Sequence, residues 1–162
     1  NFEMVLESLV RKDSSGVNFY PGPKRIQDML DLTEKDVEYL VQTLKHCGNY
    51  DYVIIDYSSD FSERQKLLMT ELADTVVYVD DLTATGLSAF NKYCQLAEFL
   101  EKRERHQILS KTAVLYNHCG RNGAAPRQDS PVIIMGCVPE INITDMRDCV
   151  SVMSRQEAFN SN

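Results

Sequence analysis

The sequence predicts an α/β fold in which a mostly parallel sheet is flanked by helices on both faces. Apolar, β-branched runs alternate along the chain with segments whose apolar residues recur at helical spacing. The runs are apolar at consecutive positions, which is typical of parallel strands buried on both faces. A polar residue follows each run, at the end of the strand where open α/β sheets bind their ligands.

Composition predicts a single globular domain over residues 1–162, with 43% hydrophobic residues. The net charge of −7 argues against a nucleic-acid partner bound through bulk charge. The five cysteines are odd in number, widely spaced and without a CxxC motif, so neither a disulfide framework nor a zinc site is expected, and a reducing cytosol fits best. From these residues we expect neither a signal peptide nor a transmembrane segment, because no apolar run among them is long enough.

The N-terminal third begins with apolar residues at helical spacing, which predict a helix over 2–12. A short strand is expected over 17–20, followed by a loop that reaches Leu32. Thr33 with Asp36 forms a capping-box pattern and predicts a helix that Gly48 closes.

From residue 50 onward, strands and helices are expected to alternate. The predicted strands cover 51–56, 75–79, 111–116 and 131–138. Ser62 with Gln65 starts one helix, and Thr83 or Thr85 caps a long helix to about Arg105. The residues expected to face inward on the long helix are Leu87, Phe90, Cys94, Ala97 and Leu100. Thr144 or Asp145 opens a last helix.

The carboxyl ends of the predicted strands read Asp56, Asp80–Asp81, Asn117 and Pro139–Glu140, which are polar residues apart from Pro139. In an open parallel sheet these ends meet at one edge. A carboxylate such as Asp56 can hold a Mg²⁺-bound water there, and Asn117 offers both a donor and an acceptor, which suits a purine edge. Asp and Asn also commonly cap loops, and this interpretation stays open.

The pattern Tyr50–Asp56, Ala73–Val79 and Val114–Asn117, with helices between, resembles the MinD/ParA group of deviant P-loop ATPases of the SIMIBI type. The resemblance covers about residues 16 to 150. Within the group, Gly16–Tyr20 and the helix Leu32 to Leu44 are most similar to the CpaE/TadZ branch, whose members place Tad-type pilus or secretion machinery.

The resemblance implies ATP and Mg²⁺ as cofactors and assigns a role to each matching residue. Asp56 corresponds to the Mg²⁺-linked carboxylate at the end of the Walker B strand, and Asn117 to the asparagine that reads adenine. The loop that senses the γ-phosphate contains Ser58, Ser59 and Asp60. The segment that packs beside the base contains Val138, Pro139 and Glu140.

Two departures from the family pattern bear on activity. The loop Tyr57–Phe61 has neither the proline nor the glycine usual after the Walker B aspartate. The missing glycine matters because a glycine lets backbone N–H groups approach a phosphate. The phosphate-binding loop with its lysines is not among these residues. We therefore expect the central P-loop strand to come from an upstream part of a longer polypeptide or from a partner chain, because its neighbours would otherwise be left with unpaired edges.

The leading functional hypothesis is an ATP-binding positioning or assembly factor for a Tad-type pilus or secretion system. It would act through nucleotide-controlled homodimerisation and slow hydrolysis, in the cytoplasm, with recruitment to the inner membrane face or a cell pole. The alternative is a degenerate, non-hydrolysing scaffold of the same fold that recruits pilus or secretion components. A third hypothesis is a bacterial tyrosine kinase of the same superfamily. Such kinases end in a tyrosine-rich tail, and the residues after Met153 contain no tyrosine, which argues against this hypothesis.

Overall fold

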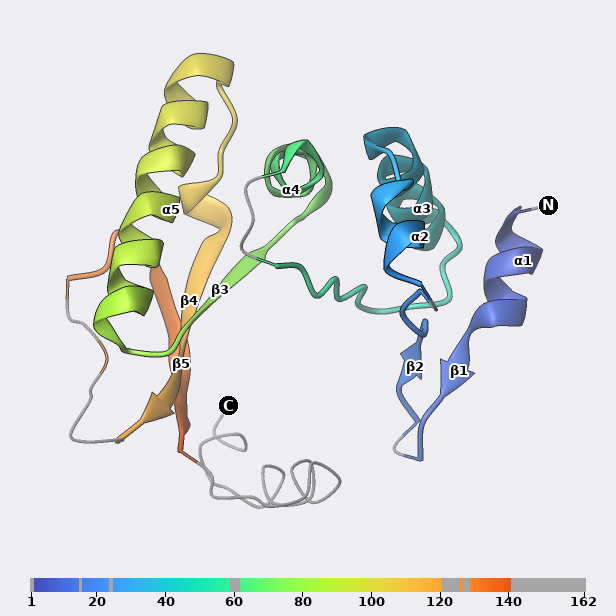
Figure 1. Cartoon of the computed structure of the whole chain (residues 1–162), viewed down its shortest axis with the longest axis horizontal. Helices are drawn as coiled ribbons and strands as arrows, with labels where there is room; N and C mark the ends of the chain where they lie inside the picture. Colours follow the sequence, from blue (N-terminus) through green and yellow to red (C-terminus); the bar gives the residue numbers. More distant parts are fainter. Residues whose placement is uncertain are drawn as a thin grey trace. The chain divides into compact units, whose positions relative to one another are not determined.

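The structure is a computed structural model, and it describes residues 2–14, 16–23, 25–58, 62–120, 126 and 129–140. The chain divides into two compact units, Asn1–Leu72 and Ala73–Asn162, which are described here one at a time (Figure 1). The single-domain organisation of residues 1–162 stays a prediction. No helix in the described ranges combines the length and the hydropathy needed to cross a bilayer.

The first unit is mostly helical. Its elements are α1 (Phe2–Leu9), β1 (Arg11–Lys12), β2 (Asn18–Phe19), α2 (Ile26–Leu30), α3 (Glu34–His46), α4 (Glu63–Leu67) and the π-helical turn η1 (Leu68–Leu72). The capping box at α3 is confirmed, because the Thr33 side chain accepts from the Asp36 N–H and the Asp36 carboxylate accepts from the Thr33 N–H. The core of this unit consists of Val37, Val41, Leu68 and Leu72.

Two local predictions for the first unit are wrong in extent. The first helix ends at Leu9, because the chain then turns into an antiparallel pair in which Arg11 lies opposite Phe19. The predicted loop before Leu32 contains the short helix α2. Gly16 has a φ of 93° at the tip of the pair, a backbone conformation that favours glycine.

The strand predicted over residues 51–56 is not formed. Residues 52–58 have no regular secondary structure, and Tyr52 and Ile54 are 87% and 92% exposed. A strand exists only where a neighbouring strand satisfies its N–H and C=O groups. In the described part of the chain the paired strands are β1 with β2, and β3 to β5 among themselves, so this segment has no partner.

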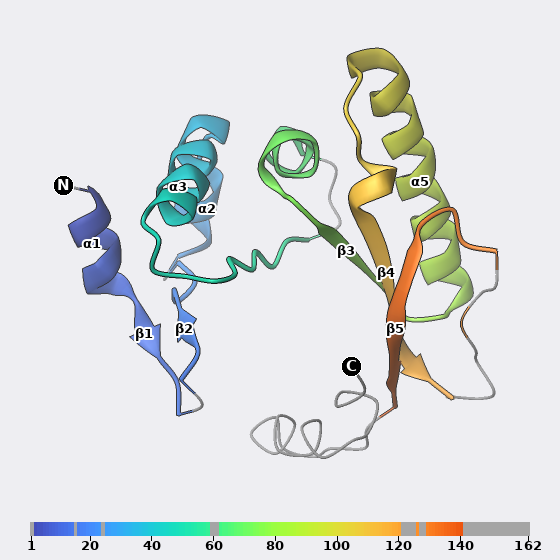
Figure 2. The ribbon, with the colours of Figure 1, turned by 180° about the vertical axis from the view of Figure 1, so that it is seen from behind.

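The second unit contains the parallel sheet. Its elements are β3 (Val76–Asp80), α5 (Ala84–Glu104), the 3₁₀ turn η2 (Leu109–Lys111), β4 (Thr112–Cys119) and β5 (Ile133–Pro139). The strands lie in the order β3-β4-β5 and both pairs are parallel (Figure 2). The predicted α/β architecture, with a parallel sheet flanked by helices, is confirmed. The helix predicted from Thr144 or Asp145 lies outside the described residues.

Helix α5 packs on the sheet through aromatic and buried polar contacts. The Tyr78 ring of β3 lies 5.0 Å from the rings of both Phe90 and Tyr93. The Tyr93 hydroxyl donates to Thr112 Oγ1 at 2.8 Å, and Thr112 Oγ1 donates to the Ile108 carbonyl at 2.8 Å. Burial is the main cause that raises the pKa of Tyr93. Of the two threonines predicted as the cap, Thr83 caps the helix. The residues predicted to face inward are buried except Leu87, which is 38% exposed, so the prediction is wrong for Leu87.

The opposite face of the sheet carries exposed apolar side chains in the described structure. Successive strand residues point to opposite faces, so Val77 and Val79 lie on the face away from Tyr78 and α5. They are 43% and 57% exposed, and Ile133 on β5 is 68% exposed. The face that contains Tyr78 is therefore covered by α5, whereas the face that contains Val77 and Val79 has apolar side chains that remain exposed in the described structure.

Candidate functional site

The carboxyl ends of β3, β4 and β5 meet at one edge of the sheet in the second unit. Asp80 at the end of β3 lies opposite Tyr116 of β4, and Cys119 of β4 lies opposite Pro139 of β5. This edge, formed by residues 80–86, 117–120 and 138–140, is called the carboxyl rim below. It is the place where open parallel sheets bind ligands.

The turn from β3 into α5 is held by the two aspartates that the sequence places there. Asp80 Oδ1 accepts from the Leu82 N–H at 2.9 Å, and Asp81 Oδ1 accepts from the Thr83 N–H at 3.0 Å. The Thr83 hydroxyl donates to Asp81 Oδ1 at 2.7 Å. These bonds from Thr83, its hydroxyl first, lower the pKa of Asp81, and His118 contributes a smaller electrostatic lowering.

Gly86 lets this turn close against the first turn of α5. A Cβ atom at this position would lie 2.6 Å from Asp80 Oδ1 and would also meet the Asp81 carboxylate. Leu82, between the aspartates and the cap, has a φ of 63°, which is rare for a leucine. Any larger residue at 86 would therefore displace the carboxylates that set the turn.

A β-bulge shapes the end of β4 around Asn117. The register changes between Tyr116, which pairs with Cys137, and Cys119, which pairs with Pro139, so β4 has one residue more than β5 there. His118 has a φ of 59° in this bulge. Asn117 is half-buried, and its Oδ1 accepts from the His118 N–H at 2.9 Å. The bulge therefore fixes the orientation of the Asn117 carboxamide.

The last residues of β5 and the residue that follows it lie beside the end of β4, as the sequence predicts. Val138 and Pro139 are half-buried and Glu140 is exposed. The Glu140 N–H donates to the Cys119 carbonyl at 3.3 Å. The structure thus brings Asn117 together with residues 138–140 at the carboxyl rim.

The remaining predicted site residues belong to the first unit. Asp56 and Ser58 are exposed on the segment 52–58, and Ser59 lies outside the described residues. The neighbouring Tyr57 hydroxyl lies 2.8 Å from the Ser62 hydroxyl, which caps α4. The prediction that Asp56 and Asn117 share one edge stays a prediction.

Asp56 is the carboxylate that the sequence predicts beside a magnesium ion. Within the described ranges, no group of three or more His, Cys, Asp or Glu side chains converges as a metal cage. Mg²⁺ in nucleotide sites is commonly held by one or two carboxylates together with phosphate oxygens and waters. A single exposed carboxylate, such as that of Asp56, is compatible with this mode of binding.

The rim contains two features that sequence reasoning missed. Cys119 and Cys137 form a disulfide between β4 and β5, so the prediction of no disulfide is wrong for this pair. Their positions at the ends of two predicted strands were the available signal, but strand pairing in space was needed to join them. The bulge at Asn117–His118 had no sequence signal, because it depends on the register with β5.

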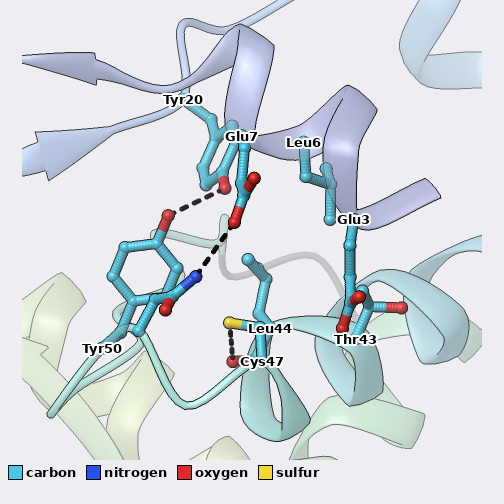
Figure 3. A pocket seen from close by; sticks show the side chains of 9 residues that line it. Glu3, Leu6, Glu7, Tyr20, Thr43, Leu44, Cys47 and Tyr50 are labelled. Atoms are coloured by element: carbon cyan, nitrogen blue, oxygen red, sulfur yellow. Dashed lines mark hydrogen bonds between the residues drawn. The ribbon is translucent and has the colours of Figure 1, made fainter. Parts of the chain in front are cut away.

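The first unit contains a small pocket lined by residues of α1, of α3 and of the segments that follow β2 and α3 (Figure 3). The Tyr20 and Tyr50 hydroxyls lie 3.1 Å apart at its wall, and the Asn49 amide donates to Glu7 at 3.3 Å. Burial, followed by the hydrogen bond with Tyr50, raises the pKa of Tyr20 to about 12. These bonds join α1 to the segment after α3, which gives the pocket a structural role.

Comparisons with known proteins identify the class of fold. No family model matches the chain, and no curated protein matches it. Among solved structures, the chain is similar to a ParA family ATPase from Chlorobium tepidum TLS, with a TM-score of 0.71 and 15% sequence identity. The similarity covers 97% of this chain and 65% of that one. The chain therefore has a fold similar to that of a ParA family ATPase, and it spans 65% of the length of that structure.

Proposed function

We propose that this chain forms the base-binding part of an adenine-nucleotide switch protein of the ParA/MinD type. The observation that carries the proposal is the similarity in fold to a ParA family ATPase over 97% of the chain. The carboxyl rim adds local support, because the rim presents Asn117 beside residues 138–140 where such folds bind ligands.

The orientation of Asn117 suits recognition of a base. Its Oδ1 is engaged by the His118 N–H, so the two N–H donors of the carboxamide are the groups that would meet ring-nitrogen acceptors of a purine. Val138 and Pro139 would contact the base from the neighbouring strand end, with the Glu140 backbone holding this segment to β4.

The phosphate end of the nucleotide would involve residues of the segment after Tyr50. In this proposal Asp56 holds a water of the Mg²⁺ ion, and Ser58 and Ser59 lie near the γ-phosphate. ATP and Mg²⁺ would be bound between two copies of the protein, and slow hydrolysis of ATP would let the two copies separate. Asp56 is exposed in the described structure, which leaves its carboxylate accessible to such a ligand.

We further propose that the switch serves a Tad-type pilus or secretion apparatus, as in the CpaE/TadZ branch. The support is the resemblance of Gly16–Tyr20 and Leu32–Leu44 to that branch. The protein would work in the cytoplasm and be recruited to the inner membrane face or a cell pole. The net charge of −7 favours a protein partner over nucleic acid.

Nucleotide binding is tested with a fluorescent ATP analogue and Mg²⁺ on the protein in its full natural length. We expect Asp56→Ala and Asn117→Ala to weaken binding at least about tenfold, the size of a lost charge-assisted or buried hydrogen bond. The matched controls are Asp51→Ala on the same segment and Asn91→Ala on the exposed face of α5. Equal affinity in all five proteins, the unaltered one included, would remove both residues from the site.

The scaffold hypothesis is favoured by the loop Tyr57–Phe61, which has neither proline nor glycine. It predicts partner recruitment without hydrolysis. Phosphate release by the full-length protein above the background of its Asp56→Ala variant would contradict it. Light scattering with and without ATP then tests dimerisation, since a nucleotide-controlled switch must change mass when ATP is added.

A further inference from the structure

Two cysteines face each other across the carboxyl rim. Cys119 on β4 and Cys137 on β5 form a disulfide with their Cα atoms 6.0 Å apart, inside the usual range for this bond. Both residues are half-buried, so a reagent in solution can reach them. They are 18 residues apart in the sequence, and the fold brings them together.

The bulge in β4 decides which residues meet. Tyr116 pairs with Cys137, but the extra residue in β4 brings Cys119 opposite Pro139 rather than Glu140. The bulge therefore places Cys119 one residue closer to Cys137 along β5 than an unbulged strand would. The conformation that orients Asn117 also aligns the two sulfur atoms, so the base-reading residue and the cysteine pair depend on the same backbone.

The same site accommodates the reduced form. Cys119 Sγ lies 3.7 Å from the Tyr116 carbonyl, which can accept from the thiol when the disulfide is open. The other described cysteines have different surroundings. Burial raises the pKa of the Cys94 thiol, which disfavours its reactive thiolate, and Cys47 donates to the Leu44 carbonyl at 3.1 Å.

We propose that Cys119 and Cys137 are a reversible thiol–disulfide pair that sets the shape of the carboxyl rim. In a reducing compartment, a disulfide of this kind is typically transient and redox-sensing rather than structural. The oxidised form ties β4 to β5 two residues after Asn117 and one residue before Val138. The reduced form leaves these strand ends joined through the hydrogen bond from the Glu140 N–H to the Cys119 carbonyl.

The oxidant would be a small disulfide such as oxidised glutathione. One cysteine thiolate attacks a sulfur of that disulfide, which forms a mixed disulfide and releases one glutathione thiolate. The second cysteine thiolate then attacks the protein sulfur of the mixed disulfide and releases the second glutathione. Two cysteine thiols are oxidised, one glutathione disulfide is reduced to two thiols, and the two cysteine protons end on the released glutathione.

The first test measures the pair without reference to any nucleotide. The full-length protein is equilibrated in buffers of varied reduced and oxidised glutathione, quenched with acid, alkylated, and analysed by peptide mass spectrometry. We expect the Cys119 and Cys137 peptides to become linked to each other with one shared midpoint, while Cys47 and Cys94 stay alkylated. Two cysteines that remain reduced in excess oxidised glutathione, or that carry glutathione independently, would overturn the proposal.

Variants separate the pair from general effects of oxidation. Oxidation should raise the midpoint of thermal unfolding by about 5–10 °C, the effect of closing a loop of this length. This rise should vanish in Cys119→Ser and in Cys137→Ser, and persist in Cys47→Ser. A rise that survives in Cys119→Ser would assign the effect to another site.

The effect on ligand binding rests on the proposed function and is tested last. We expect the affinity for a fluorescent ATP analogue to differ about fivefold between the oxidised and reduced protein, the lower end of typical coupling between sites, and to be insensitive to oxidation in Cys119→Ser. Failure to bind nucleotide in both states would contradict the proposed function and leave the cysteine pair established by alkylation. Equal affinity in both states, with the pair switching, would overturn its control of the rim.

Discussion

Strand β3 and the segment 51–58 have similar sequences and different structures. Each is a β-branched run that ends in an aspartate, Asp80 in one case and Asp56 in the other. β3 pairs with β4 from Val76 to Asp80, and Asp80 is 1% exposed. The segment 51–58 forms no strand, and its Ile54 is 92% exposed. Composition therefore predicts where a strand can form, while a hydrogen-bonding neighbour decides whether it does.

The physical reason is the cost of an unpaired strand. Extended backbone without a partner keeps its N–H and C=O groups in water, and it loses conformational entropy of about 1–2 kcal/mol per residue without compensation. β3 gains that compensation from β4 and from the Phe90 and Tyr93 rings of α5, which contact Tyr78. No such contacts with a sheet are described for residues 52–56.

The largest expected effect on stability comes from replacing one tyrosine in each of the two regions. Tyr116 of β4 is fully buried, whereas Tyr52 is 87% exposed. We expect Tyr116→Ala to lower the free energy of unfolding by about 4 kcal/mol, because it opens a cavity in the packed unit, and Tyr52→Ala to change it by less than about 0.5 kcal/mol. Urea unfolding followed by circular dichroism measures both. Similar losses for the two variants would show that the segment is packed after all.

Hydrogen exchange tests the backbone directly. The amides of Val114 and Tyr116 should exchange at least about 100-fold more slowly than those of Ile54 and Ile55, since only the former lie in a paired strand. In a longer polypeptide that supplies the expected central strand, the Ile54 and Ile55 amides should become protected. Slow exchange at Ile54 in residues 1–162 alone would contradict the conclusion that the segment 51–58 is unpaired.

A smaller effect is expected at the contact between α5 and β4. Tyr93→Phe removes the buried hydrogen bond to Thr112 Oγ1 and leaves the ring in place. We expect a loss of about 1–1.5 kcal/mol in the free energy of unfolding. Tyr39→Phe is the control, because Tyr39 is 57% exposed on α3. A neutral Tyr93→Phe would show that the hydroxyl adds little to the covered face of the sheet.

The smallest effect concerns alkaline pH and the first unit. The pKa of Tyr20 is raised to about 12, so the folded protein keeps its phenol proton when the unfolded chain, with an ordinary tyrosine pKa near 10, loses it. Stability from this group is therefore complete below pH 10 and is lost as the pH rises toward 12, by about 1 kcal/mol after allowance for solvent screening. Chemical unfolding at stepped pH measures the loss.

The Tyr20→Phe variant is the control for this titration. It should show a weaker pH dependence between pH 10 and 12, because it has no phenol proton to lose. Tyr52→Phe should behave as the unaltered chain, since Tyr52 is exposed. An identical alkaline loss in Tyr20→Phe would assign the effect to other groups.

One part of the predicted edge, the pairing of two strand ends, was readable from the sequence. Asn117 and residues 138–140 were predicted to lie together, and the parallel pairing of β4 with β5 confirms it. The disulfide between Cys119 and Cys137 was not predicted, because cysteines 18 residues apart show no pairing signal until strand register is known. The bulge at His118 was equally hidden, since a bulge is a relation between two strands.

Features that depend on neighbours a few residues away could be predicted from the sequence. These are the caps at Thr33 and Ser62, and the cap of α5 to within two threonines, together with the α/β class. That β3 is a strand while residues 51–58 are not, and that Cys119 meets Cys137, became evident only in the folded chain. A cap forms within one turn of chain, whereas a strand or a disulfide needs a partner that distant residues bring into place.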